Sequence, residues 1–162
     1  VIARAESFGL TGHETSEVLD ANKGFFKRME ALRLKAGKMM GMGDVRKSVT
    51  PKFGLIAPAI NNEAIAARYF MPWSTHPTMA VTGSQCIASC ILTPGSVADG
   101  IIDAPENGPL TVTLEHPMGS MDVTIDYSIK DGNFNHLSAG LIRSCRKLAQ
   151  GEVFIPSTVW SN

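Results

Sequence analysis

The segment that most constrains the fold is the apolar run from residue 80 to residue 92, AVTGSQCIASCIL. Its length and composition suit a helix, and after the first turn its side chains leave no continuous polar stripe. A helix that is apolar nearly all round must be buried on most of its sides. Because the neighbouring segments have the character of strands, we expect a sheet to wrap around this helix.

Other segments alternate between apolar and polar residues, as half-buried antiparallel strands do. The clearest are LTVTLEHP at 110–117 and MDVTIDYSI at 121–129. Further strands are expected at 1–7, 51–59, 64–72, 134–144 and 152–156. Apolar residues spaced three and four apart predict an amphipathic helix at 22–43. The predicted fold class is α+β: an antiparallel, barrel-like sheet wrapped around one buried helix, with one outer helix.

The start of the apolar helix is a candidate binding site. Its first turn carries Thr82, Gly83 and Ser84, and the N–H groups of a first turn lack partners within the helix. The helix dipole adds partial positive charge there, so the position favours a carboxylate or a phosphate. The alternative is an ordinary strand–loop–helix junction that a threonine or serine caps.

The loop before this helix adds polar candidates, each with a simpler alternative. Ser74 and Thr78 could bind the same anion, although turns favour such residues for conformational reasons alone. His76 either contacts a carboxylate or is a loop histidine bonded to backbone. Two cations have similar alternatives: Lys52 binds a carboxylate or is solvated, and Arg68 clamps an anion or points outward.

The composition argues against several classes of protein. The formal net charge is zero with 19% charged residues and no basic run, so nucleic acid is not an expected partner. No apolar stretch approaches the ~20 residues that span a bilayer, and no signal-peptide pattern is present, so we expect no membrane partner and a cytoplasmic location. Cys86, Cys90 and Cys145 are too few for a disulfide framework, and no metal-binding spacing occurs. Cys86 and Cys90 are expected to be buried as small apolar residues.

Six segments resemble those of a known family, in the same order: AESFGLTGHE, LRLKAGKMMGMGDV, PKFGLIAPA, RYFMPWSTHPTMAVTGS, LEHPMG and LIRSCRKLAQGEVFIP. The chain resembles the second half of the PrpF-like isomerases, relatives of diaminopimelate epimerase, and within them the 4-oxalomesaconate tautomerases. The resemblance implies two domains, each a barrel-like sheet around a central helix, with the active site between them. Residues 1–150 would then form the C-terminal domain. Residues 151–162 would form a final strand that packs on the missing N-terminal domain.

The resemblance implies a cofactor-independent proton shift, keto–enol or allylic, in an unsaturated di- or tricarboxylate such as 4-oxalomesaconate. The family's catalytic Lys and Cys lie in GGGNP-type and CGN-type segments of the first half, and neither motif occurs here. Ala80 stands where the epimerase relatives place a second catalytic Cys, and it cannot move a proton. We therefore expect no catalytic residue in this chain and no activity from it alone. Its expected contribution is a set of substrate-binding residues: His76, Thr82, Gly83, Ser84, Thr78 and Ser74.

The resemblance leaves the substrate and the assembly open. His76 matches the family's histidine in a CH-type motif, whereas Met118 stands where relatives often have a serine in an HPSG segment. One alternative is an aconitate, methylaconitate or methylitaconate isomerase. Another is a non-catalytic carboxylate-binding or dimerising module, in which two copies of the chain pair as a homodimer.

Overall fold

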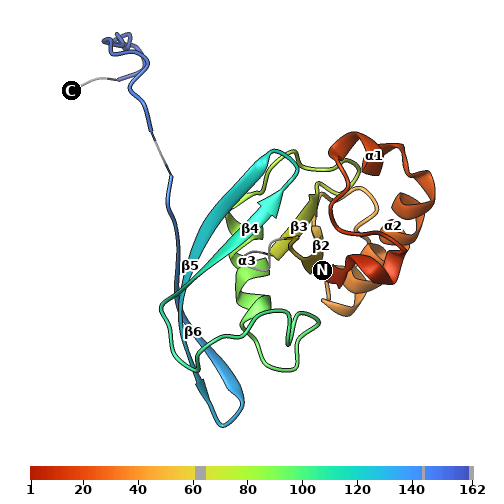
Figure 1. Cartoon of the computed structure of the whole chain (residues 1–162). Helices are drawn as coiled ribbons and strands as arrows, with labels where there is room; N and C mark the ends of the chain where they lie inside the picture. Colours follow the sequence, from red (N-terminus) through yellow and green to blue (C-terminus); the bar gives the residue numbers. More distant parts are fainter. Residues whose placement is uncertain (61–64, 144, 161–162) are drawn as a thin grey trace.

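The computed structural model describes residues 1–60, 65–143 and 145–160 of the 162-residue chain. Its main element is a curled six-stranded sheet with the strands in the order β1-β2-β3-β4-β5-β6 (Figure 1). The strands are β1 (Ile2–Arg4), β2 (Phe53–Pro58), β3 (Ile65–Phe70), β4 (Leu110–His116), β5 (Gly119–Lys130) and β6 (Asn133–Leu141). The helices are a 3₁₀ turn (Ala5–Phe8), α1 (Ser16–Ala21), α2 (Lys23–Met39) and α3 (Val81–Ile91).

The sheet is mixed. Strands β2/β3, β4/β5 and β5/β6 pair antiparallel, whereas β1/β2 and β3/β4 pair parallel. The α+β class is thus confirmed, but the prediction of a wholly antiparallel sheet is wrong at these two strand pairs. The connections explain the error: α1 and α2 lie between β1 and β2, and α3 lies between β3 and β4. A helical crossover returns the chain in the parallel direction, which the alternation of residues in each strand does not reveal.

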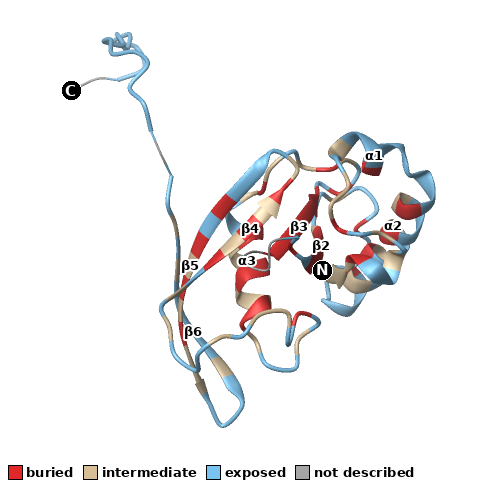
Figure 2. Ribbon diagram, in the orientation of Figure 1, coloured by how far each residue is buried: buried red, intermediate tan, exposed pale blue. Residues whose placement is uncertain are grey.

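Helices cover both faces of the central strands, so β3 is buried on both sides (Figure 2). On one face Phe25 and Met29 of α2 pack with Phe70 of β3. On the other face Ile87 of α3 packs in a cluster with Ala67 of β3 and with residues of β4 and β5. The amphipathic helix predicted at 22–43 is confirmed as α2.

The prediction of one outer helix is wrong, because a second helix, α1, precedes α2. This helix has six residues, and Leu19 is its buried residue. The side chain of Thr15 accepts a hydrogen bond from the N–H of Val18 and so caps its first turn. A helix this short shows too few apolar positions for its period to be recognised.

Helix α3 is buried on one face and exposed on the other. Its buried face packs against the sheet, whereas Thr82 and Cys86 are exposed and Cys90 is half-buried. The prediction that Cys86 is buried is therefore wrong. The error follows from the pattern itself, since an apolar helix that lacks a cover on one side looks the same in sequence as one that is fully enclosed. Enclosure of α3 by a complete barrel stays a prediction.

A buried arginine fills the gap where β3 and β4 separate. The two strands pair only at their Ile65–Leu114 and Ala66–Glu115 positions. Arg68, 3% exposed, donates from Nη1 to the carbonyl oxygens of Ala67 (3.0 Å) and Glu115 (3.3 Å). Its Nε donates to the carbonyl oxygen of Glu14 (2.7 Å). Arg68 therefore neither clamps an anion at the helix start nor points outward: its guanidinium bonds backbone carbonyls.

The loop that leads into β2 is held by a second buried arginine, Arg33 of α2. Its guanidinium pairs with both carboxylate oxygens of Glu30, at 2.7 and 2.8 Å. The same group donates to the carbonyl oxygens of Val45 (2.9 Å), Ser48 (3.1 Å) and Thr50 (3.2 Å). The loop immediately before Lys52 is thus fixed against α2.

The end of the chain runs away from the sheet after β6 (Figure 1). Residues 145–160 are exposed, including the apolar side chains of Val153 and Phe154. The strand expected at 152–156 has no sheet partner among the described residues. It stays a prediction, together with the division of the chain at 150–151, and residues 161–162 lie outside the described part.

Candidate functional site

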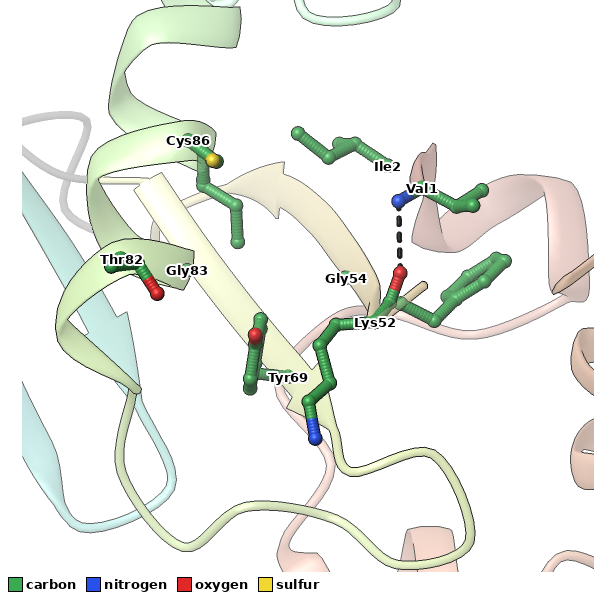
Figure 3. Close-up of a pocket in the computed structure, with 10 residues that line it drawn as sticks. Val1, Ile2, Lys52, Gly54, Tyr69, Thr82, Gly83 and Cys86 are labelled. Atoms are coloured by element: carbon green, nitrogen blue, oxygen red, sulfur yellow. Dashed lines mark hydrogen bonds between the residues drawn. The ribbon is translucent and has the colours of Figure 1, made fainter. Parts of the chain in front are cut away.

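A cavity of about 260 Å³ opens beside the first turn of α3 (Figure 3). Its walls come from strands β1, β2 and β3, from Val1 and Lys52 just before the first two of these strands, and from α3. The lining residues are Val1, Ile2, Lys52, Phe53, Gly54, Tyr69, Thr82, Gly83, Cys86 and Ile87. Most of these present apolar surface, so the few polar groups decide what the cavity can bind.

The first turn of α3 borders this cavity and has N–H groups without partners in the helix. Ala80 is the capping residue and provides no side-chain hydrogen bond. The N–H of Ser84 donates to the carbonyl oxygen of Ala80 (2.8 Å), which leaves the N–H groups of the three preceding residues without an acceptor in the helix. The alternative of a threonine or serine cap is therefore wrong. Two of those residues, Thr82 and Gly83, line the cavity.

Gly83 is buried against the ring of Tyr69. A Cβ atom at this glycine would lie 2.4 Å from Cε2 of the tyrosine ring and 2.9 Å from its hydroxyl oxygen. The lack of a side chain lets α3 approach β3 closely and sets the hydroxyl next to the first turn. Tyr69 was not among the residues predicted from sequence, because the contact joins segments fourteen positions apart in a way that no local pattern reveals.

Lys52 supplies the side-chain cation of the cavity. It is half-buried, and its side chain extends along the cavity beside Tyr69 (Figure 3). The backbone nitrogen of Val1 donates to the Lys52 carbonyl oxygen (2.8 Å), which ties the start of β1 to the start of β2. Of the two alternatives for Lys52, this position favours the carboxylate contact over a fully solvated side chain.

The predicted loop residues lie beside the cavity and are absent from its lining. The backbone N–H of His76 donates to the carbonyl oxygen of Tyr69 (2.7 Å), and its Nδ1 accepts from the N–H of Thr78 (3.0 Å). Nδ1 is therefore unprotonated and Nε2 carries the proton, so Nε2–H is available as a donor. Ser74 is half-buried, and its carbonyl oxygen accepts from the N–H of Met71 (2.9 Å).

Two hydroxyl groups of this region form hydrogen bonds within the fold. The hydroxyl of Ser84 is buried and donates to the carbonyl oxygen of Val81 (2.7 Å), so it faces the helix itself. Thr75 of the same loop is a weaker binding candidate from the sequence, and its N–H and hydroxyl both donate to Oδ1 of Asp20, at 2.8 and 2.7 Å. These bonds hold the loop before α3 against α1.

His116 at the end of β4 is a buried histidine near this loop. Its Nδ1 accepts from the N–H of Met118 (3.3 Å). Burial lowers the pKa of His116, and the positive charges of Arg68 and Arg143 lower it further. The imidazole is therefore kept neutral. Met118 itself is exposed in the turn between β4 and β5.

Comparison with known proteins places the chain in a family. The model of the PrpF protein family matches residues 1–156, so the chain belongs to the PrpF family. The YbhH protein of Escherichia coli (strain K12) is 43% identical over 156 residues, covering 96% of this chain and 43% of the relative. The (4E)-oxalomesaconate Delta-isomerase of Novosphingobium sp. (strain KA1) is 37% identical over 155 residues, with the same coverage.

A solved structure shares the fold. The crystal structure of a methylitaconate-delta-isomerase superposes with a TM-score of 0.70 at 20% identity, covering 87% of this chain and 43% of that one. The chain thus spans less than half the length of these relatives. Among its described helices none is both long and apolar enough to cross a membrane. Within residues 1–60, 65–143 and 145–160, no cluster of three or more His, Cys, Asp or Glu side chains could hold a metal ion.

Proposed function

We propose that this chain is the C-terminal, substrate-binding half of a PrpF-family isomerase that shifts a proton in an unsaturated di- or tricarboxylate such as 4-oxalomesaconate. The observation that carries the proposal is the cavity at the uncapped first turn of α3. Unpaired N–H groups and the helix dipole there favour an anion. The naming of a family relative as a 4-oxalomesaconate isomerase supports the choice of substrate class.

In this proposal the residues of the cavity hold one carboxylate of the substrate. The N–H groups of Thr82 and Gly83 donate to the carboxylate oxygens, and the Lys52 ammonium group adds a charge-assisted contact. Proton removal next to a carbonyl or carboxylate leaves an enolate, whose negative charge the same groups stabilise. His76 offers Nε2–H from the adjacent loop as a further donor.

The proton-transfer residues would come from outside this chain. Ala80, at the helix start, has no group that can exchange a proton. The chain spans 43% of the length of its relatives, which leaves room for a second domain that carries them. The cavity is also smaller than the roughly 300–1,000 Å³ of typical small-molecule pockets, as expected for half of a site between two domains. The exposed apolar segment at 152–156 would pack on that domain.

The test is an exchange assay on the protein as its cell makes it, with the intact mass measured on the same sample. The protein is incubated in deuterated water with 4-oxalomesaconate, aconitate and methylitaconate, and deuterium uptake is followed by mass spectrometry. We expect a mass well above 17.4 kDa and uptake into one of these acids. A protein of that larger mass with no uptake from any of them would overturn the proposal.

Two variants test the role of the cavity in the same assay. Lys52→Gln should raise KM about tenfold or more, because a hydrogen bond to a charged group is lost. Lys47→Gln, an exposed lysine a few residues earlier, is the matched control and should leave KM unchanged. A protein of 17.4 kDa that forms a homodimer and binds these acids without exchange would instead support the carboxylate-binding module.

A further inference from the structure

We propose that the hydroxyl group of Tyr69 is a substrate-binding donor that hydrogen-bonds the carboxylate held at the first turn of α3. This inference rests on the proposed function and adds a residue that selects for a carboxylate at this position. It would make the cavity a three-point site, with the first-turn N–H groups, the Lys52 ammonium group and the Tyr69 hydroxyl converging on one anion.

The first argument is that this hydroxyl belongs to a buried side chain and has no partner among the described residues. Tyr69 is 7% exposed and lines the cavity, and its hydroxyl has no hydrogen-bond partner among residues 1–60, 65–143 and 145–160. The chain's other tyrosine shows the usual arrangement: the hydroxyl of Tyr127 donates to the carbonyl oxygen of Pro105 at 2.6 Å. The hydroxyl of a buried tyrosine usually finds a hydrogen-bond partner, so an unpaired one that opens on a cavity suggests a ligand.

The second argument is its position. The hydroxyl lies next to the α carbon of Gly83, since a Cβ there would be 2.9 Å from the hydroxyl oxygen. In Figure 3 the Tyr69 side chain lies between Lys52 and the first turn of α3, where Thr82 is also drawn. An anion that accepts from the N–H of Gly83 would therefore be within reach of the tyrosine.

The third argument is its protonation state. Burial raises the pKa of Tyr69, and the negative charge of the nearby Cys86 thiolate would raise it further. The hydroxyl therefore keeps its proton at neutral pH and acts as a donor. Such a donor suits an ionised carboxylate, whereas it gains less from a neutral amide. The apolar residues Phe53 and Ile87 line the remaining wall, where they would contact the carbon skeleton.

The test uses trans-aconitate as the probe and the protein as its cell makes it. Binding is followed by the shifts of the backbone amide signals of Thr82 and Gly83 in nuclear magnetic resonance. Tyr69→Phe keeps the ring that packs under the helix and removes only the hydroxyl. We expect this variant to bind trans-aconitate about tenfold or more weakly, with the shift pattern otherwise retained. A monoamide of the probe should bind the wild type weakly and should lose little affinity in the variant.

Tyr127→Phe is the matched control, because it removes the other tyrosine hydroxyl far along the chain in β5. It should lower the stability of the fold and leave the affinity for trans-aconitate unchanged. Tyr69→Phe should instead weaken the binding of trans-aconitate without lowering the stability of the fold. If the wild type binds and Tyr69→Phe binds equally well, the inference is overturned while the carboxylate site stands. If the wild type shows no shift at Thr82 and Gly83, both the inference and the proposed role of this half fail.

Discussion

Gly83 and Tyr69 lie so close that no side chain other than hydrogen fits at position 83. The calculated distances from a Cβ there to the ring are 2.4 Å and 2.6 Å for Cε2 and Cζ. Both residues are buried, and the ring is held between α3 and the loop that contains His76, whose imidazole packs edge-on against it at 6.1 Å. The contact fixes how far the first turn of α3 stands from β3, and hence the width of the cavity.

Gly83→Ala should therefore destabilise the fold. We expect a loss of about 1–3 kcal/mol in the free energy of unfolding, since an added methyl group must push a packed ring. Urea unfolding measures the change. The control is Gly24→Ala in α2, where the nearest atom to a Cβ is the Asn22 side chain at 3.6 Å. There the helix propensity of alanine should stabilise by about 0.5–1 kcal/mol. Equal effects at both positions would contradict the packing argument.

Arg33 should contribute more to stability than any exposed arginine. Arg33→Met would leave the carbonyl oxygens of Val45, Ser48 and Thr50 without their donor and would free the loop before Lys52. We expect a loss of about 3 kcal/mol in the free energy of unfolding, because three backbone acceptors and the Glu30 carboxylate lose their partner together. Calorimetric and urea unfolding should agree on this loss.

The control for this substitution is Arg46→Met. Arg46 also pairs with an acidic residue, Asp44, through three side-chain hydrogen bonds, but both side chains are exposed. Water competes for such a pair, so we expect little change in stability. A loss at Arg33 no larger than the loss at Arg46 would show that burial of the guanidinium does not matter here.

The sequence predicted the fold class, most of the strands and the family, but not the shape of the cavity. Alternation and apolar runs identify strands and helices because they depend on neighbours in the chain. The contact of Tyr69 with Gly83, and the place of Lys52 beside them, depend on how β2, β3 and α3 pack. The exposure of Cys86 was mispredicted for the same reason: a periodic pattern shows which residues are apolar but not which face lacks a cover.

The stability of the fold should fall as the pH drops below neutrality, in part through His116. Its pKa in the folded chain lies below the usual value of 6.5, since burial and the nearby charges of Arg68 and Arg143 disfavour the imidazolium. The unfolded chain therefore binds more protons between the two pKa values, so stability is lost as the pH falls through that window. His116→Gln should reduce this loss in urea unfolding from pH 7.5 to 5.

The exposed histidine of β6 is the control for that measurement. His136→Gln removes an imidazole that the fold does not bury. The difference in stability between wild type and His116→Gln should shrink as the pH falls and then level off. If the difference in stability between wild type and His116→Gln stays constant with pH, then the folded and unfolded chains bind protons equally at His116.

Cys86 should report occupation of the cavity by its reactivity. Its thiol is exposed and lines the cavity, whereas Cys90 is half-buried one turn further along α3. Iodoacetamide should therefore label Cys86 and the exposed Cys145 faster than Cys90, as peptide mass spectrometry would show. Saturating trans-aconitate should slow the labelling of Cys86 several-fold and leave Cys145 unchanged. In Lys52→Gln the protection should require more of the acid. Equal protection of Cys86 and Cys145 would point to a general effect of the acid on labelling. A lack of protection at Cys86 would show that the carboxylate does not bind in this cavity.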